Sequence, residues 1–108
     1  MDKRIKRFSP LTEATYYILL SLTQPLHGYG IIKKVEEMSC SRMRLAAGTL
    51  YGALTTLLEN KLIILIGEDE DNPRRKLYQM SSLGEELIHY EMARLQEMLA
   101  NGKRETGC

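Results

Sequence analysis

Apolar residues recur at helical spacing near the start of the chain. They lie three to four positions apart, as one buried face of a helix requires, at Leu11, Thr15, Ile18, Leu19 and Leu22. Ser9 and Pro10 precede this stripe, and a capping serine followed by proline suits the first turn of a helix. Gln24 and Pro25 would end it. The pattern predicts a first helix that begins at Ser9-Pro10 and stops before Pro25.

Two more helices follow, each with its own apolar stripe. The second spans residues 28–38, and its buried side is marked by Tyr29, Ile32, Val35 and Glu36. The third runs from about residue 47 to residue 60, with an inward face formed by Leu50, Leu54, Leu57 and Leu58. Its opposite face carries Thr49, Gly52, Thr55, Thr56 and Glu59. Helical periodicity therefore predicts three short helices in succession.

The period changes after the third helix. Residues 62–66 are a short apolar run rich in isoleucine, and residues 76–80 alternate between polar and apolar side chains. Such runs favour strands, and the acidic residues 68–71 followed by Asn72-Pro73 favour a turn between them. Ser82 and Glu85 have the spacing of a capping box. We therefore expect a hairpin with a charged loop, then a long helix to about residue 99.

Helix, helix, helix, strand, strand, helix is the order of a winged helix-turn-helix. The expected fold class is α+β, mostly α, with a two-stranded wing. Residues 1–80 would form the winged-helix domain, residues 81–100 a C-terminal dimerisation helix, and residues 101–108 a flexible tail. A chain of 108 residues has room for one such core.

Composition narrows the class of protein without deciding it. The net charge of +1 is too small to indicate a nucleic-acid partner by itself. The positions of the charged residues along the chain are more informative. Lys3, Arg4, Lys6 and Arg7 predict either an N-terminal arm along DNA or a solubilising tail. No apolar run reaches the ~20 residues that cross a bilayer, and no secretory signal is visible. We expect a cytoplasmic protein whose two cysteines stay reduced.

An ordered set of short motifs resembles the PadR-like family of bacterial transcriptional regulators. These motifs are Leu11-Thr12-Glu13, His27-Gly28-Tyr29-Gly30-Ile31, Gly48-Thr49-Leu50-Tyr51, Leu58-Glu59, Leu62-Ile63, Arg74-Arg75-Lys76-Leu77-Tyr78 and Ser81-Ser82-Leu83-Gly84. The resemblance covers residues 11 to about 99. It implies a homodimer that represses nearby genes. It also implies that a small molecule often relieves this repression. The chain departs from the family pattern at Ala46, Gly52 and Lys61, where serine, proline and glycine are usual.

The start of the third helix is the predicted DNA-reading element. Small side chains would let its backbone enter a major groove, where a hydroxyl can approach a base edge or a phosphate. The residues concerned are Ala47, Gly48, Thr49, Tyr51, Gly52 and Thr55. Tyr29 and Lys33 of the second helix are candidates for backbone contacts, as are Arg74, Arg75 and Lys76 of the wing. The alternatives are a merely exposed Thr49, tyrosines that only pack on the core, and a solvated wing tip.

The last helix is predicted to pair two copies of the chain. Its apolar seam has 4-3-4 spacing, at Ile88, Met92, Leu95 and Leu99, and Leu87 widens it. Leu11 of the first helix would join the interface, because so small a monomer cannot cover both apolar faces. The alternative is that the seam packs against the first helix of the same chain.

Enzymatic function finds no support in the sequence. Neither His27 nor His89 has a nucleophile or carboxylate at a recognisable spacing, and no phosphate loop, cofactor fingerprint or metal-ligand set is present. His27 is interpreted as a capping or packing residue. The expected partners are double-stranded DNA, a second copy of the chain and a small-molecule effector of unknown identity. The alternative function is a winged-helix module that binds protein and not DNA.

Overall fold

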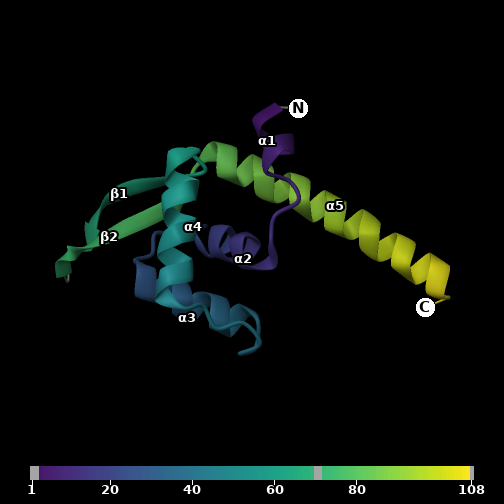
Figure 1. Ribbon diagram of the computed structural model, residues 1–108, viewed down its shortest axis with the longest axis horizontal. Coiled ribbons are helices and arrows are strands. Elements are labelled where there is room, and N and C mark those ends of the chain that lie inside the picture. The colour runs from purple at the N-terminus through teal and green to yellow at the C-terminus, as the bar shows by residue number, and fades with distance from the viewer. Residues whose placement is uncertain (1–2, 70–71, 108) are drawn as a thin grey trace.

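A computed structural model describes residues 3–69 and 72–107 of the chain. Its elements run in the order α1 (Lys3–Phe8), α2 (Glu13–Ser21), α3 (Gly28–Met38), α4 (Ala47–Glu59), β1 (Ile63–Asp69), β2 (Asn72–Met80) and α5 (Ser82–Thr106). Helices α2, α3 and α4 cluster beside the β1–β2 hairpin, and α5 runs from that cluster far out to one side (Figure 1). This arrangement confirms the predicted winged helix with a C-terminal helix.

The core lies where the three clustered helices meet the base of the wing and the first turns of α5. Helices α2 and α4 bury most of their predicted stripes, because an amphipathic helix must bury its apolar face. In α3 the buried apolar residues are Ile31 and Val35, whereas Tyr29 of the predicted stripe is 60% exposed. The buried apolar residues are Ile5, Ile18, Leu19, Leu22, Ile31, Val35, Leu50, Leu54, Leu57, Leu62, Ile63, Tyr78, Leu87 and Ile88. Tyr78 also binds the backbone of Leu26 in an isolated bridge, which ties β2 to the loop before α3.

The first long helix begins later than the sequence predicts. Ser9 is not its cap: the Thr12 side chain accepts a hydrogen bond from the Thr15 amide, and α2 starts at Glu13. The Ser9 hydroxyl is directed elsewhere, to Glu91 of α5 at 2.6 Å. The basic residues before it form α1, whose Ile5 is buried and which packs on α5. Residues 3–8 are therefore attached to the body of the protein and not a free arm.

The last helix also differs from its prediction at both ends. Its cap is Ser81, one residue before the predicted Ser82, and the Ser81 hydroxyl accepts from the Gly84 amide at 3.1 Å. The helix continues through residues 101–106, which are therefore helical where the sequence predicts a tail. Lys103 and Arg104 lie in the last turn, where cations favour the helix dipole, and Gly107 ends the helix at φ 76°.

Helix α4 ends in a left-handed residue that is not glycine. Lys61, which follows the C-cap Asn60, has φ 61°, a conformation that costs a residue with a Cβ roughly 1–2 kcal/mol. Its carbonyl accepts from the Ser81 hydroxyl at 2.7 Å, and the Leu62 carbonyl accepts from the Ser81 amide at 3.0 Å. The turn after α4 is thus hydrogen-bonded directly to the start of α5.

Candidate nucleic-acid interface

The outer face of α4 is open and small-sided along its first two turns. Ala47, Gly48, Thr49 and Gly52 are exposed, while Leu50 and Leu54 of the same helix are buried. A methyl group built at Gly48 or at Gly52 would meet nothing within 4 Å. The helix backbone can therefore approach a groove closely on this side, as the sequence predicts for a reading helix.

Thr49 and Thr55, the two threonines of this face that the sequence predicts to bind DNA, differ in how their hydroxyls are used. The Thr55 hydroxyl donates to the Tyr51 carbonyl at 2.9 Å, so its proton is occupied within the helix. The Thr49 hydroxyl has no hydrogen bond to any residue that the structure describes, and it lies in the first turn of α4. Thr49 is therefore the better placed of the two to donate to a base or a phosphate.

A hollow of about 380 Å³ joins α4 to the wing and to the start of α3. Its walls are His27, Gly28, Tyr29, Tyr51, Arg75, Lys76 and Tyr78. Four predicted site residues from three separate elements therefore meet here: Tyr29, Tyr51, Arg75 and Lys76. Arg75 and Lys76 are exposed. The backbone of Arg74 lies in β2, but its side chain is outside the described residues.

Tyrosines give this hollow its shape. Tyr51 is half exposed and lies across the start of α3, where a methyl group on Gly28 would overlap the Tyr51 hydroxyl. Tyr78, which also lines the hollow, is buried. Burial, and then the nearby Tyr51, raise the pKa of Tyr78. Tyr29 is 60% exposed, and the ammonium group of Lys33 lies 5.8 Å from its ring centroid, so both remain on the surface.

His27, like Gly28 and Tyr78, lines the hollow but is not among the DNA-binding candidates that the sequence predicts. It caps α3, as predicted: its Nδ1 accepts from the Gly30 amide at 3.1 Å. Its ring lies nearly parallel to that of Tyr29, with centroids 6.5 Å apart, and its Nε2 is 3.3 Å from Nη1 of Arg75. A histidine at a helix-cap position was the available signal.

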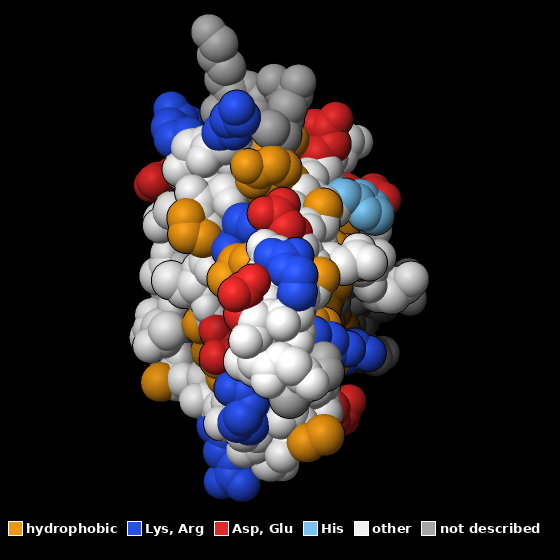
Figure 2. Space-filling model, turned by 90° about the vertical axis from the view of Figure 1, so that its right-hand side faces the viewer, with side chains coloured by type: hydrophobic (Ala, Val, Ile, Leu, Met, Phe, Trp, Pro, Cys, Tyr) orange, Lys and Arg blue, Asp and Glu red, His pale blue; other side chains and the backbone are white. Residues whose placement is uncertain are grey.

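The predicted dimer seam divides into a buried part and an exposed part. Leu87 and Ile88 lie in the core of the chain itself. Their assignment to a dimer interface is therefore corrected, because their buried side chains cannot contact a second copy. Met92, Leu95 and Leu99 are 47%, 41% and 60% exposed, and so is Met98 at 54%. On this side of the molecule, hydrophobic side chains are interspersed with charged ones (Figure 2). Leu11 is half-buried against the core.

A second hollow, of about 290 Å³, lies between α2 and α5 beside the exposed seam. It is lined by Leu11, Glu13, Tyr16, Tyr17, Glu91, Arg94 and Leu95. Glu13 is paired with Arg42 of the α3–α4 connector, and the hydrogen bond from Arg42 lowers the pKa of Glu13. Arg42 and Arg44, which pairs with Glu36 at 3.4 Å, are thus both engaged with carboxylates.

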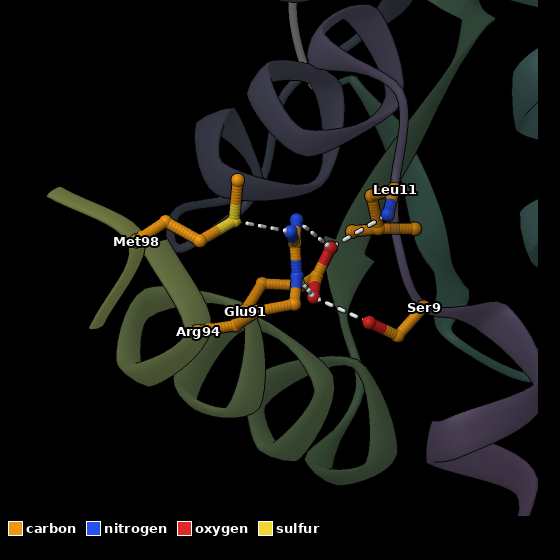
Figure 3. A network of polar contacts seen from close by, with 5 residues as sticks. All are labelled: Ser9, Leu11, Glu91, Arg94 and Met98. Atoms are coloured by element: carbon orange, nitrogen blue, oxygen red, sulfur yellow. Dashed lines mark hydrogen bonds and ion pairs between the residues drawn. The ribbon is translucent and has the colours of Figure 1, made fainter. Parts of the chain in front are cut away.

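Glu91 is the only fully buried carboxylate among the described residues, with 0% exposure. It accepts from the Ser9 hydroxyl and from the Leu11 amide, both at 2.6 Å, and from two nitrogens of Arg94 at 2.8 and 3.1 Å. Arg94 also donates to the sulfur of Met98 (Figure 3). Burial alone raises the pKa of Glu91, but the hydrogen bonds from Arg94, Leu11 and Ser9 outweigh it, so this pKa lies below its ordinary value of 4.5.

Two further classes of site find no support in residues 3–69 and 72–107. No three histidine, cysteine, aspartate or glutamate side chains gather there as a metal site would need. None of the helices in those ranges is both long enough and apolar enough to traverse a lipid bilayer.

Known proteins share both the sequence pattern and the fold. The sequence profile of the Transcriptional regulator PadR-like family matches residues 17–90. A PadR-like transcription factor from Bacteroides fragilis has 27% identical residues, with a TM-score of 0.68 over 84% of this chain and 86% of that one. A PadR family transcription regulator from Clostridium difficile R20291 has 23% identity and a TM-score of 0.74, covering 90% of this chain and all of its own.

A relative with a longer chain also matches. It is an uncharacterized 37.1 kDa protein in transposon TN4556 of Streptomyces fradiae, 36% identical over 87 residues. The match covers 77% of this chain but 24% of that protein, so this chain spans about a quarter of its length. The match therefore gives no information about the remainder of that protein.

Proposed function

The chain belongs to the PadR-like family of transcriptional regulators, and from this premise we propose that it is a repressor that binds a two-fold symmetric operator as a homodimer. One observation carries the proposal. A single hollow brings Tyr51 of α4 together with Arg75 and Lys76 of β2, so the reading helix and the wing cations belong to one surface. Small side chains on α4 would enter the major groove while the cations contact the flanking phosphates.

The first test separates base contact from phosphate contact. Thr49→Ala should weaken binding to DNA from upstream of the protein's own gene by about three- to tenfold, which is the contribution of one hydrogen bond. It should also reduce discrimination against scrambled DNA.

Arg75→Ala should weaken binding to both the upstream and the scrambled DNA. It should also reduce the slope of log K against log salt concentration by about one unit. Gel shifts over a salt series measure both effects. Arg104→Ala, an exposed cation near the end of α5, is the matched control; an unchanged slope for Arg75→Ala would disprove the wing contact.

The second test concerns the homodimer, which is supported by the exposed apolar side chains of α5. Leu95→Glu together with Leu99→Glu should convert a dimer into a monomer, because four carboxylates would meet in an apolar interface. Both side chains are exposed, so the fold should survive. Sedimentation analysis gives the mass. Ala93→Glu lies on the opposite side of the helix by its 100° spacing and should leave the mass unchanged; a wild-type monomer at every concentration would refute the proposed dimer.

A small-molecule effector is also proposed, held in the hollow between α2 and α5. The supporting features are its size of about 290 Å³ and its position beside Leu95 of the proposed interface. A molecule bound there would contact the helix that pairs the two copies, and could thereby alter the spacing of the reading helices. Binding there would appear as a change in the environment of Tyr16 and Tyr17.

A second candidate function, a protein-interaction module, is favoured by one specific observation. Ile64, Leu65 and Ile66 of β1 are 46%, 47% and 42% exposed, and adjacent exposed aliphatic side chains are typical of protein contacts. The salt series distinguishes the two candidates. Failure of the wild-type chain to bind any duplex at low salt would favour the interaction module.

A further inference from the structure

Gly28, the first residue of α3, is packed against the side chain of Tyr51 in α4. A methyl group built on Gly28 would overlap the Tyr51 hydroxyl oxygen and would lie 3.0 Å from Cζ of the same ring. Gly28 is buried, whereas Tyr51 is 51% exposed. Position 28 must therefore stay free of a side chain for the Tyr51 ring to lie across the start of α3.

The backbone at position 28 does not itself require glycine. Among the described glycines only Gly67 and Gly107 have a positive φ, and alanine suits an ordinary helical position better than glycine does. The three atoms nearest to a methyl group on Gly28 all belong to the Tyr51 side chain, whereas at Gly84 the nearest atom is a backbone oxygen. Alanine at position 28 would therefore displace a side chain and leave the backbone in place.

The side chain that would be displaced belongs to the candidate DNA interface. Tyr51 lines the hollow of about 380 Å³ together with Arg75 and Lys76 of β2, and both of these cations are exposed. A phenolic hydroxyl can donate a hydrogen bond to a phosphate oxygen. A ring that is already packed against a neighbouring helix loses less freedom on binding than a mobile one does. The place of this ring should therefore affect the affinity for DNA.

We propose that Gly28 is a positioning residue for DNA binding, because it lets the Tyr51 hydroxyl occupy the place from which it donates to a phosphate of the DNA backbone. The inference rests on the proposed function and deepens it, since it names the kind of contact that Tyr51 makes and the residue that sets it. Gly28 is buried and acts only through Tyr51. The absence of a side chain in α3 thus determines where a side chain of the reading helix meets the DNA.

The experiment is a double-mutant cycle between the two residues. Gly28→Ala, Tyr51→Phe and the double variant, all as full chains, are titrated by fluorescence anisotropy with duplexes of equal length, one from upstream of the protein's own gene and one scrambled. Each single variant should bind both duplexes about tenfold less tightly, the effect of losing one hydrogen bond to a charged group. The ratio of the two affinities should not change, since phosphate contacts carry no sequence information. The double variant should bind as Tyr51→Phe does, because the hydroxyl that Gly28 positions is already absent.

The salt dependence tests whether the wing has moved instead. A phenol is neutral and displaces no counterion, so the slope of log K against log salt should be the same in the wild type, in Gly28→Ala and in Tyr51→Phe. A smaller slope in Gly28→Ala would assign the loss to the wing cations and would overturn the inference. Gly30→Ala is the matched control in the same helix. A methyl group there would lie 3.4 Å from the Leu26 side chain, an ordinary contact, so binding should not change.

Thermal unfolding tests the steric part of the proposal without DNA, and it does so even if Gly28→Ala alone folds poorly. Tyr51→Ala empties the space beside Gly28, so adding Gly28→Ala to that variant should leave Tm unchanged or raise it. A lower Tm there would overturn the inference. Wild-type binding that Gly28→Ala retains in full, or an equal loss from Gly28→Ala with and without the Tyr51 hydroxyl, would overturn the inference alone. Failure of the wild type to bind either duplex would overturn the proposed function as well.

Discussion

Glu91→Ala is expected to lower the free energy of unfolding by about 3–5 kcal/mol, the cost of breaking a buried ion pair from one side. Glu91 is fully buried and accepts four hydrogen bonds. Its removal would leave Arg94, the Leu11 amide and the Ser9 hydroxyl, all of them partly buried, without their acceptor. Urea unfolding followed by circular dichroism measures the change. The segment before α2 should also be held less firmly on α5, since this carboxylate is one of the contacts between them.

The matched control for this substitution is Glu105→Ala. Glu105 lies on the same helix and pairs with Arg104 at 3.3 Å, but it is 76% exposed, so its loss should change stability by less than about 0.5 kcal/mol. An effect of Glu91→Ala no larger than that of Glu105→Ala would contradict the structural role of the buried carboxylate.

The same carboxylate predicts a pH dependence of stability. Because the folded-state pKa of Glu91 lies below its ordinary value of 4.5, the folded protein holds the proton less tightly than the unfolded chain does. The carboxylate therefore contributes fully above pH 4.5, and this contribution is lost as the pH falls through the lower folded-state pKa. Glu91→Gln should be less stable than the wild type at pH 7, and the difference should shrink in acid. An equal difference at pH 7 and pH 3 would contradict this assignment.

Gly84→Ala is expected to destabilise the fold by about 3 kcal/mol, as overpacking at a closed contact does. An added methyl group would overlap the Leu62 carbonyl oxygen and come within 2.9 Å of Met80. The carbonyl cannot withdraw easily, because it already accepts from the Ser81 amide at 3.0 Å. Thermal unfolding measures the loss. Gly102→Ala is the matched control in the same helix: nothing lies within 4 Å of it, so alanine should be neutral or stabilise by about 0.5–1 kcal/mol.

Elements whose signals are local can be predicted closely from the sequence. The periodicity predicts α3 over residues 28–38, and it spans Gly28–Met38; α4 is predicted from residue 47 and spans Ala47–Glu59. Their caps and stripes lie within a few residues of one another, so neighbouring residues carry all the information. The winged fold follows from the order of such elements, and the resemblance to the family follows from the set of short motifs.

Elements that depend on distant partners are predicted less well. The predicted cap Ser9 instead donates to Glu91, 82 positions away, and no local pattern shows that partner. The seam of α5 is visible as a stripe, but the stripe does not say that Leu87 and Ile88 meet the chain's own core. The sequence does hold one indication of this burial. Glu91 lies on the apolar face of α5, and a buried carboxylate requires hydrogen-bonding or charged partners.

The candidate site follows the same rule. Small residues of α4 and cations of the wing can be identified from residue type and element. The neighbourhood of His27 and Arg75 cannot, because 48 positions separate them and only the folded hairpin brings them together. Whether each of these residues contacts DNA stays a prediction.

Helix α5 is one continuous helix, but only its first turns are packed against the rest of the chain. Its first turns are packed into the core through Leu87, Ile88 and Glu91, but from Met92 on most side chains are exposed. A free helical segment of about 15 residues is only marginally ordered in water, so the outer half of α5 should open locally at little cost, independently of the domain. Its winding and its association with another surface are then linked equilibria. Any contact there must supply the free energy that orders the segment, which makes association weaker and more readily reversed than the buried area alone would indicate.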